Sequence, residues 1–313
     1  MGASIIDGRG RADRLCAELA MDVAAMIAQD NLRPTLATIL VGDDPASEIY
    51  VRRKAEQAEQ VGIRSLRFRL PAETDTASLL GLVAGLNADP DVHGILVQLP
   101  LPDHIDRAAI LDAIEPGKDV DGFHTLNAGR LALGVTGLVP CTPAGCMILL
   151  ADHLSDLQGR HAVVVGCSNI VGRPLAQLLL QARCTVTVAH IHSVNLPGLV
   201  GLADILVVAA GSPGLIRGDW LKFGVVILDV GINRITDPVT GTARIVGDVR
   251  FNEALDRAAA ITPVPGGVGP MTIACLLRNT VIAARQSRKR TMFTNIPGSA
   301  EHHRSNMQEE VIS

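Results

Sequence analysis

The sequence contains very few aromatic residues. Its 313 residues include five Phe, one Trp and one Tyr, or 2% aromatic in all. Hydrophobic residues nevertheless make up 48%, which is typical of a globular protein. The core must therefore be built mainly from Ala, Val, Leu and Ile. The single tyrosine, Tyr50, stands four residues before Lys54, and this spacing needs an explanation.

Other features are also missing, and each absence excludes a class of protein. The net charge of −4 argues against a general nucleic-acid-binding surface. The N-terminus lacks a basic segment followed by an apolar one, so we expect no secretory signal. No apolar run reaches about 18 residues without polar interruptions, so we expect no membrane span. The six cysteines are scattered without a C-x-x-C motif, which is typical of reduced cysteines in a cytoplasmic protein; we expect no metal site.

Short apolar segments alternate with amphipathic ones through the first third of the chain. This pattern predicts strands at 35–42, 65–70 and 93–102. It also predicts one helix around Tyr50 and Lys54 and another at 76–89. The β-α-β-α-β order implies a parallel sheet with right-handed crossovers.

The same alternation restarts after residue 142. Helices are predicted at 142–154 and 173–182, and the predicted strands are 161–166, 184–190, 204–211 and 225–232. We therefore predict an α/β chain of two α/β domains, with a hinge in the glycine-rich stretch 127–143. From Ser287 onwards the sequence is polar, and we expect a mobile tail there.

A glycine-containing loop follows the strand predicted at 161–166. Gly166 ends the strand, Gly172 opens the next helix, and Pro174 suits a first helical turn. Free backbone N–H groups and the helix dipole at such a place favour a pyrophosphate. The spacing is not G-x-G-x-x-G, so an ordinary tight turn is the alternative.

The end of the following strand is where a dinucleotide's ribose is usually bound. The segment 188–193 has no acidic residue there to bind the ribose hydroxyls of NAD. It has no strong cationic site for the extra phosphate of NADP either, and the nearby candidates are His190, His192 and Arg173. These residues leave the choice between the two cofactors open.

Three polar residues stand in or beside apolar segments. Gln98 lies at the end of the predicted strand 93–102, and Asp119 and Asp121 follow in an irregular loop. Taken singly, Gln98 is equally well explained as a satisfied buried amide, and the aspartates as solvated turn residues. Together with Lys54 they can form an acid–base site, because a nearby carboxylate and amide tune a lysine in an apolar cleft.

The segment 261–272 contains three prolines and three glycines. Such a stiff segment presents backbone groups in one shape, as the wall of a ligand site does. A rigid crossover between domains is the other interpretation.

These segments together resemble the bifunctional methylenetetrahydrofolate dehydrogenase/methenyltetrahydrofolate cyclohydrolase family, the FolD type. The matching strings occur in family order at 41–63, 94–102, 116–124, 127–131, 140–146, 163–174, 227–233, 246–249 and 262–272. The resemblance implies two α/β domains around a cleft, the second of them a Rossmann-like nucleotide-binding domain, and a homodimer. The implied division is a folate-binding catalytic domain at 1–141 with a returning helix at 269–286, an NAD(P)-binding domain at 142–268, and a tail at 287–313.

The resemblance also implies the chemistry and the residues that carry it. The enzyme would oxidise 5,10-methylenetetrahydrofolate to 5,10-methenyltetrahydrofolate with NADP, or with NAD as the second candidate, and then hydrolyse the product to 10-formyltetrahydrofolate. The implied catalytic residues are Lys54, Gln98 and Asp121. For the substrate they are Tyr50, which would stack on the aminobenzoyl group, with Ser47, Gly267 and Val268. For the cofactor they are Gly166, Cys167, Ser168, Gly172, Arg173, His190, Ile191, Ile232 and Thr272.

Three positions depart from the family pattern. Family members often carry Arg, Lys or Ser where this sequence has Cys167, Ile191 and Val194. Two alternatives stay open: an NAD-preferring dehydrogenase with weak cyclohydrolase activity, and a non-catalytic folate-binding paralogue. A Tyr-x-x-x-Lys pair also occurs in short-chain dehydrogenases, but there the nucleotide loop precedes the pair, whereas here Gly166 follows it.

Overall fold

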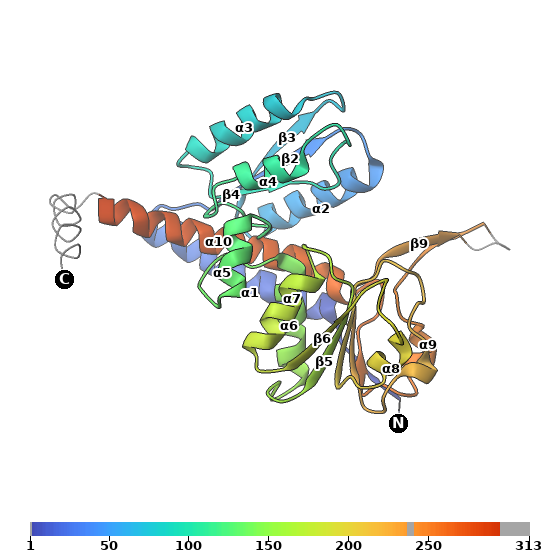
Figure 1. The fold of residues 1–313 in the computed structure, drawn as a ribbon. Coiled ribbons are helices and arrows are strands. Elements are labelled where there is room, and N and C mark those ends of the chain that lie inside the picture. The colour runs from blue at the N-terminus through green and yellow to red at the C-terminus, as the bar shows by residue number, and fades with distance from the viewer. Residues whose placement is uncertain (1, 237–240, 295–313) are drawn as a thin grey trace, which may run out of the picture.

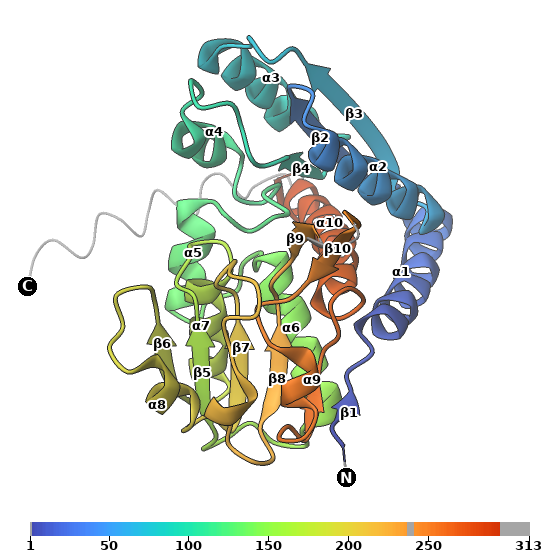
Figure 2. The ribbon, with the colours of Figure 1, turned by 90° about the vertical axis from the view of Figure 1, so that its right-hand side faces the viewer.

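The computed structural model describes residues 2–236 and 241–294. Two parallel sheets with their helices lie on opposite sides of two long helices, α1 (Gly8–Asp30) and α10 (Val268–Thr294) (Figures 1 and 2). The chain therefore has the predicted architecture of two α/β units.

The first sheet has three parallel strands in the order β3-β2-β4. The strands are β2 (Thr35–Val41), β3 (Arg64–Leu70) and β4 (Gly94–Val97). Every residue of the central strand β2 is buried, which explains its continuous apolar sequence. The strand predicted at 93–102 is much shorter, because Pro100 and Pro102 have no N–H to continue the ladder. The accompanying helices are α2 (Pro45–Gln60), α3 (Thr76–Ala88) and α4 (Arg107–Ala113).

The second sheet has six parallel strands in the order β1-β11-β8-β7-β5-β6. The strands are β1 (Ser4–Ile5), β5 (His161–Val165), β6 (Thr185–Ala189), β7 (Ile205–Val208), β8 (Val226–Asp229) and β11 (Ala260–Ile261). The strand order reverses between β5 and β7, which makes a topological switch point at their carboxyl ends. Because β1 pairs with β11, the N-terminal strand belongs to this sheet and not to the first unit, where the predicted boundary placed it.

The remaining helices accompany the second sheet and its connection to the first. They are α5 (Thr125–Ala132), α6 (Cys141–His153), α7 (Gly172–Gln181), α8 (Leu196–Val200), α9 (Phe251–Ala254) and a 3₁₀ turn at Gly218–Trp220. The stretch 127–143, predicted to contain a hinge, is partly helical: α5 and the start of α6 occupy its two ends, and residues 133–140 connect them. The helix α5 forms there because Asn127 and Leu131 are buried on one face of it.

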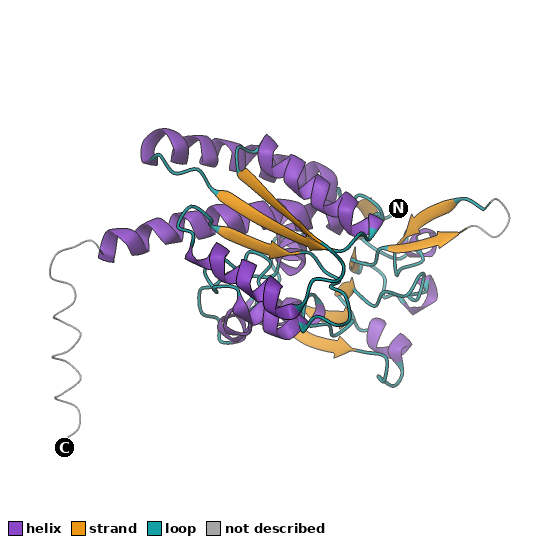
Figure 3. Ribbon diagram, turned by 90° about the horizontal axis from the view of Figure 1, so that it is seen from above, coloured by secondary structure: helices purple, strands orange, loops and turns teal. Residues whose placement is uncertain are grey.

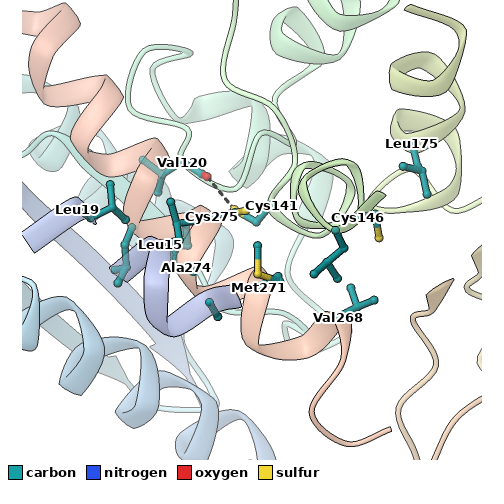
Figure 4. Close-up of a cluster of buried hydrophobic side chains, with 14 of the residues drawn as sticks. Leu15, Leu19, Val120, Cys141, Cys146, Leu175, Val268, Met271, Ala274 and Cys275 are labelled. Atoms are coloured by element: carbon teal, nitrogen blue, oxygen red, sulfur yellow. Dashed lines mark hydrogen bonds between the residues drawn. The ribbon is translucent and has the colours of Figure 1, made fainter. Parts of the chain in front are cut away.

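Helices α1 and α10 pack against each other, and α10 also contacts α6, α2, β2 and β4. Figure 4 shows the core at this junction, with Leu15 and Leu19 from α1 near Ala274 and Cys275 from α10, and with Val268 from α10 near Cys146 from α6. The expected tail begins later than Ser287, because α10 continues to residue 294. Ion pairs from Arg285 to Asp22 and from Arg288 to Asp30 hold this extension against α1. Residues 295–313 of the predicted tail lie outside the described residues.

A two-stranded antiparallel hairpin, β9 (Asn233–Thr236) and β10 (Ala243–Val246), projects from the body of the protein (Figures 1 and 3). It follows β8 and therefore starts at the carboxyl edge of the second sheet. Within the described parts of the chain, no helix is both long enough and apolar enough to cross a membrane.

Candidate active site

Lys54 and Gln98 meet at the carboxyl edge of the first sheet. Helix α2 begins after Asp44, whose side chain accepts a hydrogen bond from the Ser47 N–H at 2.8 Å. Ser47 is buried and lies seven residues before Lys54, on the same helix face. Lys54 Nζ donates to Gln98 Oε1 at 3.0 Å, and Gln98 Nε2 donates to the Leu99 carbonyl at 2.6 Å. The second bond orients the amide so that its oxygen faces the lysine.

Asp121 is the third member of this cluster. Burial raises the pKa of Asp121 to about 6, the charge of Lys54 opposes this rise, and the charge of Asp119 adds to it. The carboxylate therefore lies within electrostatic reach of the lysine. At neutral pH it is mostly ionised, and no described residue donates a hydrogen bond to it. A ligand that carries N–H groups can donate hydrogen bonds to this carboxylate.

Asp119, two residues earlier, has a different environment. It is 1% exposed and accepts hydrogen bonds from the backbone N–H groups of residues 122, 123 and 124 and from Asn127 Nδ2, at 2.9–3.2 Å. Gly122 has a φ of +75°, and a Cβ there would stand 2.6 Å from the Pro140 nitrogen. Asp119 thus fixes the loop that carries Asp121.

A cavity of about 700 Å³ lies next to this cluster. Its lining includes the half-exposed ring of Tyr50, the proline-rich segment 263–270 and the loop 229–232. Lys54, Gln98 and Asp121 are not part of the lining, whereas Tyr50 and Arg53 of the same helix as Lys54 are. Helix α2 therefore links the cluster to the cavity.

The two residues predicted in the proline-rich segment line the cavity through a tightly packed backbone. The Val268 side chain is 3% exposed and belongs to the core shown in Figure 4. The Gly267 carbonyl lies against Gly8, where an added Cβ would come within 1.8 Å of it. Ile232, which was predicted to contact the cofactor, is 52% exposed and also lines this cavity.

The glycine loop lies at the switch point of the second sheet. A Cβ on Gly166 would stand 2.2 Å from the Ala209 carbonyl at the end of β7, and a Cβ on Gly172 would stand 1.9 Å from the Gly166 carbonyl. Only glycine fits either position, so the two βα turns pass in direct contact. Ser168 Oγ accepts from the Val171 N–H at 3.2 Å, and α7 starts without a side-chain cap. Arg173 is exposed and its Nε donates to the Cys167 carbonyl at 3.1 Å.

The end of β6 presents histidines and apolar side chains to solvent. His190 Nδ1 accepts a hydrogen bond from the His192 backbone N–H at 3.2 Å. Ile191 and Val194 are 94% and 88% exposed. Thr272, the remaining predicted cofactor residue, shares a 2.9 Å hydrogen bond with Thr142 at the start of α10 and α6.

Comparison with known proteins decides the family. The model of the tetrahydrofolate dehydrogenase/cyclohydrolase catalytic domain matches residues 6–121, and that of the family's NAD(P)-binding domain matches residues 140–288. The bifunctional protein FolD 1 of Rhizorhabdus wittichii is 60% identical over 286 residues, which cover 91% of this chain and 96% of that protein. The chain belongs to the tetrahydrofolate dehydrogenase/cyclohydrolase family.

Solved structures of the family agree. The bifunctional FolD enzyme of Campylobacter jejuni superposes with a TM-score of 0.87 at 48% identity, covering 91% of this chain and 99% of the other. The Trypanosoma brucei enzyme, complexed with NADP cofactor and an inhibitor, gives a TM-score of 0.88 at 41% identity, covering 92% and 99%. The protein is therefore a bifunctional dehydrogenase and cyclohydrolase of folate one-carbon metabolism, as the sequence predicted.

Several residues around the site of this family member were not found by sequence reasoning. Asn279 on α10 donates to the carbonyls of Val120 and Val139 at 2.8 and 2.9 Å, next to the Asp121 loop. Cys141 donates to the Val120 carbonyl at 3.3 Å, and burial, with a smaller contribution from Asp121, raises the pKa of its thiol. Asn279 stands 159 residues from Val120 in the chain, so no local pattern marks it.

Proposed function

We propose that the Lys54 cluster and the adjoining cavity carry out both reactions on one bound folate. The enzyme oxidises 5,10-methylenetetrahydrofolate to the 5,10-methenyl form with NADP and then hydrolyses it to 10-formyltetrahydrofolate. The observation that carries the proposal is the 3.0 Å hydrogen bond between Lys54 and Gln98. Asp121, to which no described residue donates a hydrogen bond, lies within electrostatic reach of Lys54, and Tyr50 of the same helix lines the cavity.

The oxidation requires mainly that the folate is held in place. The Tyr50 ring offers a surface for the aminobenzoyl group, and the Asp121 carboxylate can accept two N–H groups of the pterin ring. NADP, when bound at the second-sheet edge, supplies the nicotinamide that takes a hydride from the methylene carbon. The role of the protein in this step is to hold the folate and the nicotinamide in the relative orientation that hydride transfer needs.

The hydrolysis requires proton transfer. Water adds to the cationic methenyl carbon, and one ring nitrogen leaves that carbon. One proton of the water passes to the departing nitrogen and the other is released to solvent, so that the cation becomes a neutral formyl product. Lys54 is the titratable group nearest this path, and Gln98 holds its ammonium in one direction through a 3.0 Å bond. Ser47 lies on the same helix face and completes the buried wall beside the lysine.

NADP is the cofactor we propose, for two reasons. The Trypanosoma brucei relative is complexed with NADP, and no acidic residue at the end of β6 repels a ribose phosphate. The groups placed to receive the pyrophosphate and ribose are the N–H groups from Gly166 to Gly172 and the side chains of Ser168 and Arg173, with His190 and Ile191 at the end of β6. The alternative, an NAD-preferring enzyme with weak cyclohydrolase activity, predicts the opposite order of cofactors.

We propose a homodimer formed along the β6 edge of the second sheet. Exposed apolar side chains support this: Val188, Ile191 and Val194 on and after β6, and Leu180 on α7, are 38–94% exposed. All six cysteines are free thiols, which suits the cytoplasm. We propose the domain division predicted from the sequence, at residue 141, with the exception of β1; α10 contacts α1, α2, β2 and β4 of the first unit and also α6 of the second.

One assay tests the proposal. The absorbance of the methenyl product is followed during its formation from 5,10-methylenetetrahydrofolate with NADP and NAD in parallel, and during its decay after addition without cofactor. We expect formation to be faster with NADP and decay to be faster than in buffer. A protein that binds folate and catalyses neither reaction would be the non-catalytic paralogue.

A further inference from the structure

Asp248 is the most completely bonded charged group at the cofactor edge. It lies just after β10 and is 0% exposed. Its Oδ2 accepts from the backbone N–H groups of Ala210 and Gly211 at 2.7 and 2.9 Å. Its Oδ1 accepts from the Ser212 N–H at 2.9 Å and from Asn233 Nδ2 at 2.8 Å. None of the residues predicted to bind a ligand takes part in this network.

The loop that Asp248 holds stands at the switch point. Residues 210–212 follow β7 directly, and the Ala209 carbonyl at their start contacts Gly166 of the glycine loop. Ligands of open α/β sheets bind at this reversal of strand order. A displacement of residues 210–212 would therefore move one wall of the dinucleotide crevice.

Asn233 extends the network to the other ligand. It opens β9 immediately after Ile232, which lines the large cavity. A second buried carboxylate, Asp229, accepts hydrogen bonds from the backbone N–H groups of Asp248 and Val249 at 3.0 and 2.9 Å. These bonds hold the backbone around Asp248 in place. One side chain thus ties the loop after β7 to the loop after β8, at the place where cofactor and folate must meet.

We propose that Asp248 is a positioning residue for the dinucleotide, acting through residues 210–212 and Asn233. This inference rests on the proposed function, because it assumes that the cofactor binds at the switch point. The charge of Asp248 is needed: four donors converge on two carboxylate oxygens. An asparagine would offer one oxygen and turn an NH₂ group toward two donors.

The bifunctional reaction provides an internal control, since hydrolysis of methenyltetrahydrofolate consumes no cofactor. For Asp248→Asn we expect the dissociation constant of NADPH, measured by fluorescence titration, to rise about tenfold or more. The dehydrogenase KM for NADP should rise with it. Hydrolysis of methenyltetrahydrofolate without cofactor should stay within about threefold of the unmodified enzyme.

Asp204→Asn is the matched control. Asp204 also accepts a backbone hydrogen bond in this sheet, from the His161 N–H at 2.9 Å, but at the opposite edge of the sheet, away from the switch point. It should leave the NADPH dissociation constant unchanged. Asn233→Ala removes one of the four donors and should weaken NADPH binding two- to fivefold; it decides the matter if Asp248→Asn does not fold.

Three results would contradict the inference. The first is an unchanged NADPH dissociation constant in Asp248→Asn, or in Asn233→Ala if the former does not fold. The second is an equal loss of both activities in Asp248→Asn. The third is an increase of the NADPH dissociation constant in Asp204→Asn as large as that in Asp248→Asn. If the unmodified enzyme bound neither NADPH nor NADH, the cofactor assignment itself would fail and the inference with it.

Discussion

Asp119 beside the first sheet and Asp248 beside the second each accept four hydrogen bonds from nearby loops. The difference between the two regions lies in the second acid of each. Burial raises the pKa of both Asp121 and Asp229 to about 6. Asp229 accepts three backbone N–H groups, whereas no described residue donates a hydrogen bond to Asp121. Only the first region therefore leaves a carboxylate free to bind a ligand.

The same contrast holds for cations. Lys54 at the first edge is half-buried and held by Gln98, while the second edge offers the exposed Arg173 and histidines. Acid–base chemistry needs a titratable group in a partly desolvated place, and cofactor binding needs backbone donors and shape. The proposed function therefore assigns the acid–base chemistry to the first sheet edge and cofactor binding to the second.

The largest expected effect is at the lysine. Lys54→Met keeps an apolar stem and removes the proton-transfer group, so the cyclohydrolase rate should fall about 100-fold or more. Lys54→Arg should fail as well, because a guanidinium stays protonated. Arg52→Met, on the exposed face of the same helix, is the control and should stay active. Retained hydrolysis of methenyltetrahydrofolate by Lys54→Met would remove the lysine from the mechanism.

The next largest effect is on folate affinity. Asp121→Asn offers the pterin one acceptor and a mismatched donor, so binding should weaken by roughly 1.5–3 kcal/mol. Binding of NADPH should be unchanged, because Asp121 belongs to the first sheet. Calorimetry with each ligand measures both. Equal affinity for folate in the variant would place Asp121 outside the site.

The same substitution should stabilise the free protein. The folded-state pKa of Asp121 is raised, so the carboxyl group favours folding when protonated, and this contribution disappears as the pH rises through about 6. Asp121→Asn stays neutral, so at pH 7.5 it should gain on the order of 1–2 kcal/mol, and the gain should vanish near pH 4. Thermal unfolding across this pH range measures it.

Asp112→Asn provides a control of opposite sign. Hydrogen bonds from Thr125 lower the pKa of Asp112, so its ionised form stabilises the fold and the substitution should destabilise the protein at neutral pH. A loss of stability in Asp121→Asn at pH 7.5 would mean that burial does not disfavour the ionised Asp121 carboxylate in the folded protein.

The smallest expected effect concerns cofactor choice. The ratio of kcat/KM for NADP over NAD should exceed one, because no acidic residue at the end of β6 repels the extra phosphate. Arg173→Ala should lower the ratio about threefold to tenfold, as expected for one exposed cation facing a phosphate. A ratio below one would identify an NAD enzyme. An unchanged ratio in Arg173→Ala would remove that side chain from phosphate binding.

Much of the secondary structure on which this comparison rests was predictable from local sequence patterns. The strand predicted at 35–42 is β2 at Thr35–Val41, and the helix predicted at 76–89 is α3 at Thr76–Ala88, because a buried strand and an amphipathic helix each leave a periodic signature. The approach of Gln98 to Lys54 was also expected. The ligand-binding roles of these residues stay predictions.

The rest depends on contacts between distant segments. Asp119 and Asp121 look equivalent in the sequence, and only the fold shows that Asp119 accepts four hydrogen bonds within the loop whereas no described residue donates one to Asp121. The helix α5 inside the stretch 127–143 was not predicted, because it depends on Asn127, which bonds to Asp119 and to the Pro116 carbonyl. The long reach of α10 follows from ion pairs with α1, more than 250 residues earlier.

The central claim is that one folate site serves both reactions. The most direct test is to measure inhibition of the dehydrogenase and of the cyclohydrolase by one non-reacting tetrahydrofolate analogue, in the unmodified enzyme and in Asp121→Asn. One shared site predicts the same inhibition constant for both activities, within about twofold, and the same increase of both constants in the variant. Two different constants, or an increase for one activity alone, would contradict it.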